Sequence, residues 1–279
     1  MTDWTIGSLA EAIKARKISP VEAVREYLDR IARLDSKLRA FILVDAEGAL
    51  ARARALEKEP PRGPLHGIPL AYKDLCAVRG LPTSCGTRTP DYFLSARECT
   101  AVTRLSRAGA VTLGKLNMSE LAMGPFGDNA HHGDAQNPWR LGHITGGSSS
   151  GSGGAVAARL CAGALGSDTG GSIRLPAAAC GIVGLKATYG RVSRAGAMPL
   201  SWSYDHLGPM TLTVRDCAIL LGVIAGHDPA DATSSRRRVP DYTAALDGPV
   251  RGLRVGVPGN YYFDGLDVEV DAAIRAAVA

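Results

Sequence analysis

Apolar residues recur along the chain at two spacings, one typical of helices and the other of buried strands. The clearest helical pattern follows Ser19-Pro20-Val21-Glu22, where a serine–glutamate capping box with proline at the first helical position precedes an apolar stripe. Ser8 with Glu11 forms a second capping box and predicts an earlier helix. Further helices are expected at residues 46–56, 101–108, 118–123, 214–225 and from 268 onward.

Short apolar runs between these helices predict strands. They lie at residues 41–44, 68–72, 110–113, around 182–183 and at 253–257. Because helices and strands alternate, we expect an α/β fold with a largely buried sheet. The pattern at 267–279 stops without a cap or a closing element, so it is either a C-terminal helix that frays or part of a longer chain.

Composition and charge argue against several classes of protein. Apolar residues make up 46% of the chain and charged residues 21%, a globular composition with ample side chains for a core. The net charge of +5 is spread out, and the basic run 236–238 lacks interleaved aromatic residues, so no direct nucleic-acid binding is expected. No apolar run is long enough to span a bilayer, and no secretory leader is recognisable, so we expect no membrane contact and a cytoplasmic location.

The sequence also offers no convincing metal or cofactor motif. The six cysteines form no CxxC pair and do not combine with histidine at zinc-ligand spacing, and there is no HExxH. Residues 109–115 match the first seven positions of a P-loop, but Leu116 stands where Ser or Thr must hold magnesium. We therefore expect neither a metal nor a cofactor.

The segment 145–176 concentrates glycine and serine in two clusters. Such a segment is either a flexible linker or a tight backbone cradle that aims hydroxyls at a substrate. Linkers are poor in apolar residues, whereas here Ala155-Val156-Ala157-Ala158 interrupts the clusters and a strand-like run follows at 180–185. The composition therefore favours the cradle, with a serine as nucleophile.

A serine nucleophile needs a base, and no histidine is well placed to be one. Lysine can serve only when it is neutral, which requires burial to lower its pKa from about 10.4 by roughly three units. Lys73 fits, because it follows the apolar run 68–72. The alternative is a purely structural lysine at a strand end, paired with Asp74.

Two segments in register resemble the amidase signature family. One is GGSSSGSGGAVAA followed by GSDTGGSIRLPAAACGIVGLKATYGRVS, and the other is GIPLAYKD, which is similar to the family's lysine segment. The likeness extends through essentially the whole chain, including LGKLNMSELAMG, DHLGPMTLTVRD and LRVGVP. It implies an α/β fold with a mixed, largely parallel central sheet covered by helices on both faces. Family members are considerably longer, so we expect 1–279 to be a single domain that is incomplete at its C-terminal end.

The resemblance also implies a triad of a lysine, a bridging serine and a nucleophilic serine. Lys73, Ser148 and Ser172 occupy these positions, 75 and 24 positions apart. Ser172 would attack an amide carbonyl, and its proton would pass through Ser148 to neutral Lys73 and return to the leaving amine. The oxyanion hole would consist of backbone N–H groups, those of Thr169, Gly170, Gly171 and Ser172.

Further residues are expected to support this triad. In the family the bridging serine follows a cis peptide bond, so the bond from Gly147 to Ser148 is expected to be cis. Asp168 and Arg174 are expected to brace the loop, and Ser149 to hold the lysine network. A purely structural role explains each of these three side chains equally well.

Three functions fit the pattern. The first is an amide hydrolase that acts on a small-molecule amide and could form a homodimer. The second is the A subunit of a tRNA-dependent amidotransferase, a glutaminase that works with B and C subunits. The third is an inactive, truncated amidase. Leu175 weakly favours the first, because glutamine-using A subunits usually carry glutamine there, whereas Ser150 in place of a common glycine changes little.

Overall fold

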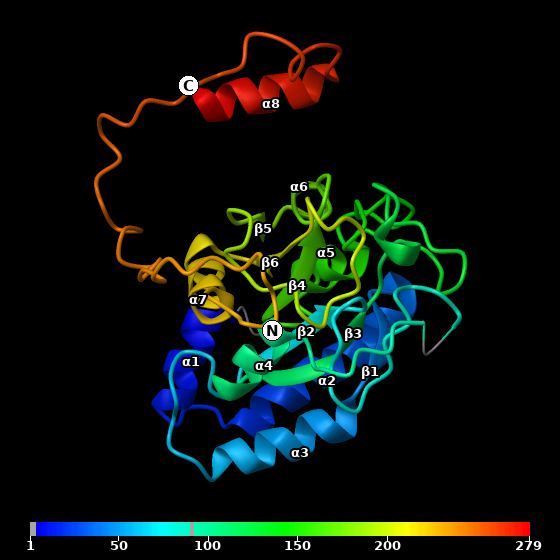
Figure 1. Cartoon of the computed structure of the whole chain (residues 1–279), viewed down its shortest axis with the longest axis vertical. Helices are drawn as coiled ribbons and strands as arrows, with labels where there is room; N and C mark the ends of the chain where they lie inside the picture. Colours follow the sequence, from blue (N-terminus) through cyan, green and yellow to red (C-terminus); the bar gives the residue numbers. More distant parts are fainter. Residues whose placement is uncertain (1–3, 90–91) are drawn as a thin grey trace. The chain divides into compact units, whose positions relative to one another are not determined.

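The computed structural model describes residues 4–89 and 92–279, and its described residues form two compact units. The first unit ends at Thr243 and contains the sheet, and the second is Ala244–Ala279 (Figure 1). Every strand of the described residues lies in the first unit, and the second unit contains the helix α8 (Val268–Val278). All residues that the sequence assigns to catalysis therefore belong to the first unit.

The first unit begins with three helices, α1 (Ile6–Lys14), α2 (Pro20–Leu38) and α3 (Ala46–Glu57). The predicted cap of α2 is confirmed, since Ser19 Oγ accepts from Glu22 N and Glu22 Oε2 accepts from Ser19 N. The predicted cap of α1 is wrong. Thr5 is its N-cap. Ser8 stands at the third helical position, where a capping box usually has glutamate, and its Oγ accepts from Thr5 N at 2.9 Å.

A six-stranded sheet forms the centre of the first unit, in the order β1-β3-β2-β4-β6-β5. Its strands are β1 (Phe41–Val44), β2 (Pro69–Lys73), β3 (Val111–Leu116), β4 (Gly163–Asp168), β5 (Val183–Gly184) and β6 (His206–Thr211). The sheet is mixed, as predicted. Parallel pairing is confined to β2 with its neighbours β3 and β4, and the other three pairs are antiparallel, so the sheet is not largely parallel.

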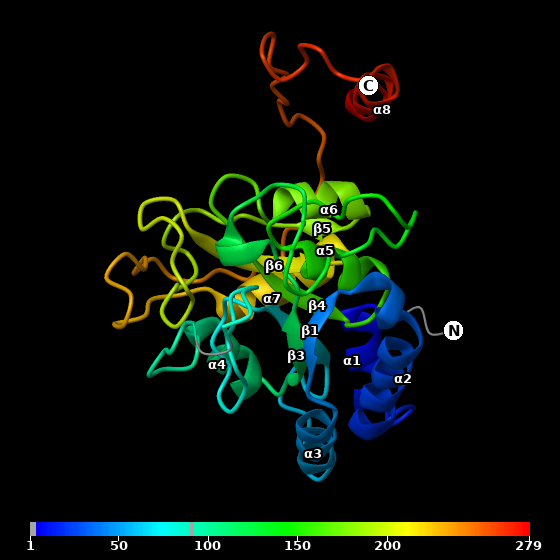
Figure 2. The same ribbon diagram turned by 90° about the vertical axis from the view of Figure 1, so that its right-hand side faces the viewer.

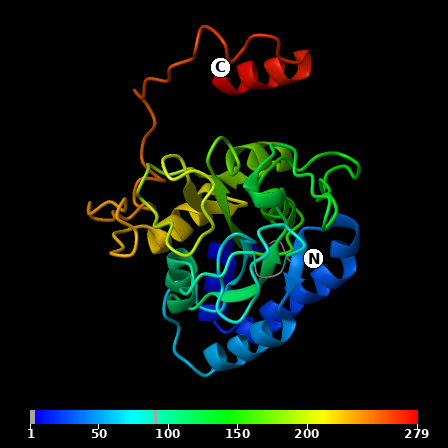
Figure 3. The ribbon, with the colours of Figure 1, turned by 45° about the vertical axis from the view of Figure 1, so that its right-hand side comes forward.

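The central strands β2 and β4 are buried at every position. A strand with no exposed side chain is covered on both faces of its sheet, and Figures 2 and 3 show helices on either side of the strands. The remaining helices are α4 (Thr100–Arg107), α5 (Ser150–Ala157), α6 (Arg174–Cys180), α7 (Val214–Ile224) and the 3-10 turn η1 (Glu120–Ala122). The helix expected at 118–123 is thus only this single turn.

The strand predicted at 253–257 does not form. These residues are exposed, and no strand of the described residues pairs with them. A strand needs a partner for its backbone N–H and C=O groups, so an apolar run alone does not make one. Helix α8 forms as predicted, with Asp267 as its N-cap, but it buries none of its residues.

Candidate active site

Lys73 is the last residue of β2, and its side chain is fully buried. Its Nζ lies 2.6 Å from Ser148 Oγ and 2.9 Å from Ser167 Oγ. The carboxyl end of β2 meets the carboxyl end of its parallel neighbour β4, which carries Ser167, and so the two side chains share one edge of the sheet. The structure therefore brings the predicted base into contact with the predicted relay.

Burial lowers the pKa of Lys73 to about 7, because a low-dielectric surrounding disfavours the ammonium form. Nearby acidic groups, Cys76, Asp168 and Asp205, act in the opposite direction and are outweighed. No salt bridge to Lys73 is found among the described residues. A neutral amine is thus populated near pH 7, as a lysine base requires.

Asp74 does not pair with Lys73, so the pairing expected in the structural alternative for this lysine is wrong. The Asp74 carboxylate instead forms a buried ion pair with Lys115 at 2.9 Å and accepts from Ser84 N and Ser84 Oγ. Lys115 Nζ also donates to Pro82 O and Thr83 Oγ1, both at 3.0 Å. Lys73 ends β2 and Asp74 begins the turn that follows, and the two side chains enter separate networks.

The peptide bond from Gly147 to Ser148 is cis, as the resemblance implies. Backbone crowds this segment, since Gly147 N donates to Pro125 O at 2.6 Å. A Cβ at position 147 would lie 2.6 Å from Gly124 O, closer than real contacts allow, so only glycine fits. Ser148 itself is fully buried, with its carbonyl accepting from Ser119 N.

Ser149 reaches Lys73 only through Ser167. Its Oγ accepts from Ser167 N and donates to Ser167 O, both at 3.2 Å, and so it fixes the backbone that carries the second acceptor of the lysine. Ser152 donates to Leu165 O on the same strand and takes no part in the lysine network. Ser150 Oγ is buried and has no hydrogen-bond partner among the described residues.

Sequence reasoning missed Ser167. It lies in GALGSD, a strand of glycine, serine and aspartate without an apolar pattern, and such a segment does not predict a strand. The available signal was its place directly before Asp168 and the TGGS run. If β4 is recognised as parallel to β2, the edge shared by the two strands points to Ser167.

Ser172 lies in the turn before α6 and is partly exposed. Its carbonyl accepts from Ser149 N at 3.3 Å, which ties the turn to the bridging segment. Within the described part of the chain, Ser172 Oγ makes no hydrogen bond, and the backbone N–H groups of residues 169–172 donate none. Four consecutive donors without a protein acceptor form a site suited to a developing oxyanion.

Asp168 holds the far end of this turn. Its Oδ2 accepts from the backbone N–H groups of Ile173 and Arg174, and the Arg174 guanidinium donates to both carboxylate oxygens at 2.9 Å. Burial acts to raise the pKa of Asp168, but the bonds from Arg174 and Ile173 outweigh it and lower that pKa. The contacts expected of a brace, between Asp168 and Arg174, are therefore present.

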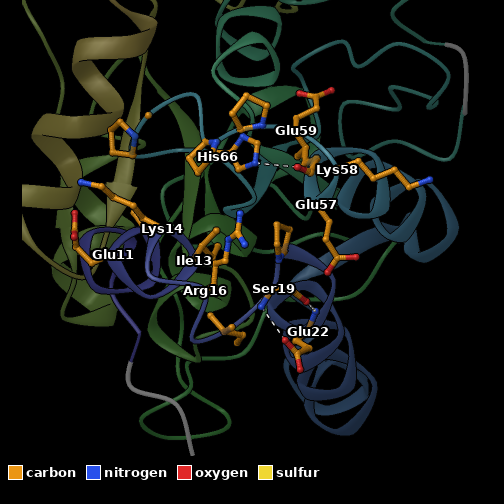
Figure 4. A pocket seen from close by; sticks show the side chains of 18 residues that line it. Glu11, Ile13, Lys14, Arg16, Ser19, Glu22, Glu57, Lys58, Glu59 and His66 are labelled. Atoms are coloured by element: carbon orange, nitrogen blue, oxygen red, sulfur yellow. Dashed lines mark hydrogen bonds between the residues drawn. The ribbon is translucent and has the colours of Figure 1, made fainter.

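A cavity of about 720 Å³ adjoins this edge of the sheet, and its wall includes Ser167 and Thr169. Apolar side chains supply much of the remaining wall, among them Leu75, Met198 and Leu207. A larger hollow of about 1130 Å³, shown in Figure 4, lies between α1, the start of α2 and the loop that ends at His66. It contains none of the predicted site residues, whereas the smaller cavity is lined by Thr169 of the predicted oxyanion hole, though not by Lys73, Ser148 or Ser172.

The described residues contain no group of three or more His, Cys, Asp or Glu side chains that could hold a metal ion. In the same part of the chain, no helix is both long and apolar enough to cross a membrane.

Comparison with known proteins gives one consistent result. The family model Amidase matches residues 22–279. A curated relative from Chromohalobacter salexigens, the A subunit of glutamyl-tRNA(Gln) amidotransferase, is 50% identical over 281 residues, which cover 100% of this chain but 58% of that protein. The chain thus spans less than two thirds of the length of this relative.

Solved structures agree with the family match. A structure described as an unexpected vestigial protein complex that reveals the evolutionary origins of an s-triazine catabolic enzyme superposes with a TM-score of 0.94 at 38% identity, covering 99% of this chain and 61% of that one. The native peptide amidase from Stenotrophomonas maltophilia superposes with a TM-score of 0.83 at 42% identity, covering 88% and 53%. On the family match, the sequence identity and the shared fold, the chain belongs to the amidase family.

Proposed function

We propose that the chain carries the catalytic centre of an amide hydrolase that works through an acyl-enzyme on Ser172. Lys73 is the base and Ser148 relays the proton between them. The observation that carries this proposal is the 2.6 Å contact between Lys73 Nζ and Ser148 Oγ, made by a lysine whose pKa burial brings to about 7. A lysine held for structure alone would be charged and paired with a carboxylate.

In the first half-reaction Ser172 Oγ forms a bond to the carbonyl carbon of the amide. Its proton moves to Ser148 Oγ as the Ser148 proton moves to neutral Lys73 Nζ, and the carbonyl oxygen becomes an oxyanion held by the N–H groups of residues 169–172. The C–N bond then breaks, and the proton returns through Ser148 to the departing nitrogen. Ammonia or an amine leaves, and an ester on Ser172 is left behind.

Water completes the second half-reaction. Lys73, neutral again, takes a proton through Ser148 from the attacking water, whose oxygen bonds to the ester carbon. The ester C–O bond breaks, Ser172 recovers its proton along the same path, and a carboxylic acid is released. Atoms and charge balance over the two halves with the amide and one water as the reactants.

A fluorophosphonate probe tests this assignment directly, because its phosphorus bonds covalently to an activated serine. We expect stoichiometric labelling, mapped to Ser172 by mass spectrometry, and loss of labelling in Ser172→Ala and Ser148→Ala. Ser152→Ala is the matched control, since Ser152 is, like Ser148, a fully buried serine of the same segment, and its hydroxyl donates to Leu165 O. Labelling at another serine would contradict the proposal. A protein that unfolds cooperatively but is not labelled would favour the inactive, truncated amidase.

A second function, the A subunit of a tRNA-dependent amidotransferase, is favoured by the name of the curated relative at 50% identity. In that case the amide would be glutamine, and the ammonia would pass to B- and C-type subunits. Stable co-purification with such subunits would support this function over free hydrolysis. A homodimer in sedimentation, with hydrolysis of simple amides, would support the hydrolase.

We further propose that the protein works in a reducing cytoplasm. All six cysteines are free and buried, which is consistent with such a compartment. Localisation of a tagged chain in cell fractions tests this point.

A further inference from the structure

We propose that Asp205 is a positioning residue for the oxyanion hole and acts through Thr169. The inference rests on the proposed function, since it concerns the same row of N–H groups, residues 169–172. Asp205 begins the family-like segment DHLGPMTLTVRD, and the sequence alone assigns it no role. The structure gives it contacts on two sides.

On one side, Asp205 Oδ1 accepts from Thr169 Oγ1 at 2.5 Å. Thr169 is the first residue of the row and follows directly on β4. It is partly buried and lines the 720 Å³ cavity, as Asp205 does. The carboxylate therefore fixes the side chain of the residue whose backbone N–H begins the row.

On the other side, Asp205 Oδ2 accepts from the backbone N–H groups of Leu200 and Ser201, at 2.8 and 2.9 Å. Both oxygens are thus engaged, and the carboxylate is held in one orientation. The loop that it caps is itself anchored, because Trp202 O accepts from Tyr189 Oη at 2.7 Å and from Arg194 Nη1 at 2.6 Å. A fixed loop thereby becomes a fixed support for Thr169.

The row needs such a support at both ends. Two of its four residues, Gly170 and Gly171, have no side chain to pack, and glycine loses the most conformational freedom on ordering. Asp168 holds the far end through the N–H groups of Ile173 and Arg174. Asp205 holds the near end at Thr169, so two carboxylates bracket the row and restrict its movement.

The test compares the rate of fluorophosphonate labelling at Ser172 in matched variants of the full chain. Thr169→Val removes the hydroxyl and keeps the backbone N–H, and Asp205→Ala removes the acceptor. We expect each to slow labelling by about 10-fold or more, since a lost oxyanion donor costs about 10²–10³ in rate and a displaced one somewhat less. The double variant should be no slower than the slower single variant, because both remove one interaction.

Two controls separate positioning from general stability. Thr169→Ser keeps the hydroxyl and should restore most of the labelling rate. Thr100→Val breaks an equivalent threonine–aspartate pair, Thr100 Oγ1 to Asp228 at 2.6 Å, which lies outside the row and should leave the rate unchanged. Additive losses in the double variant, or an equal loss in Thr100→Val, would overturn the proposal.

A crystal structure of Thr169→Val supplies a readout that does not depend on activity. We expect residues 169–171 to shift while the contact between Asp168 and Arg174 stays in place. An unmoved row would overturn the role of Asp205 even if labelling were slow. Absence of labelling in the wild-type protein would instead contradict the proposed function, and the crystal structure would still decide the positioning role.

Discussion

Lys73 and Asp74 are adjacent in the chain, yet their side chains enter two separate buried networks. Lys73 contacts two serine hydroxyls, whereas Asp74 pairs with Lys115. The separation leaves the first lysine without a carboxylate to hold its proton and the second with one at 2.9 Å. Lys73 can therefore exchange protons near neutral pH, whereas Lys115 anchors the Asp74 carboxylate in a buried ion pair.

The pH dependence of activity should follow the Lys73 amine. Burial lowers its pKa to about 7, and only the neutral form accepts a proton. We expect the rate of Ser172 labelling to rise about tenfold per pH unit below 7 and to level off above it. A profile that is flat from pH 5 to pH 8 would contradict the assignment of Lys73 as the base.

Replacing Lys73 by alanine should abolish labelling, and replacing it by arginine should not rescue it. Arginine keeps the length and the hydrogen-bond donors but cannot be neutral at working pH. Labelling at pH 8 is the measurement, with circular dichroism to show that each variant is folded. Substantial activity of Lys73→Arg would refute the neutral-lysine mechanism.

Lys73 should also make folding stability depend on pH. Its folded pKa, about 7, lies below the unfolded value of about 10.4, so between these values the unfolded state binds one more proton. Stability therefore rises with pH across this window, and the equilibrium constant for folding increases by up to about tenfold per pH unit. Lys73→Met should lack this slope when the free energy of urea unfolding is compared at pH 7.5, 8.5 and 9.5. If the wild type and the variant showed the same dependence of this free energy on pH, the pKa of Lys73 would not be lowered by folding.

Ser167→Ala should slow labelling about tenfold while leaving the fold intact, because the lysine loses the acceptor at 2.9 Å that orients it. It should also shift the midpoint of the pH profile, which loss of a purely structural hydroxyl would not do. Ser152→Ala removes a buried hydroxyl that bonds to the same strand and is the matched control. If both variants had the same labelling rate and the same pH midpoint, Ser167 would have no role in orienting Lys73.

Lys115→Met should destabilise the protein by about 3–5 kcal/mol, since it leaves the Asp74 carboxylate buried without its cation. The change should appear as a lower midpoint of urea unfolding. Adding Asp74→Asn should recover part of the loss, because the uncompensated charge is then gone. If Lys115→Met left stability unchanged, the pair would not be the anchor that its burial indicates.

The sequence led to Lys73, Ser148 and Ser172 because each lies in a segment with its own signature. It did not lead to Ser167 or Asp205, whose contacts with Lys73 and Thr169 arise from pairing between distant strands. Asp168 on β4 faces His206 on β6, and this register alone places Asp205 next to Thr169. Strand β6, HLGPMT, contains glycine and proline and shows no alternation, so neither it nor its pairing was predictable from local pattern.

Local pattern located four of the five predicted strands, β1, β2, β3 and β5, and the predicted helices other than 118–123. Capping and apolar spacing at α2 are local, and a helix satisfies its backbone within itself. The run 253–257 shows the converse, since its apolar residues have no partner strand among the described residues and stay exposed. Pairing, rather than propensity, decided where the strands formed.

The parallel contact between β2 and β4 also sets when reactivity can arise during synthesis. Lys73 and Ser167 are 94 positions apart, and long-range strand pairing is slow because the intervening chain must first be ordered. On a ribosome, a nascent chain that has not yet released β4 contains Ser148 but not Ser167, so Lys73 lacks one of its two hydroxyl partners. On the mechanism proposed above, probe labelling of stalled chains should begin only after translation has passed Ser172.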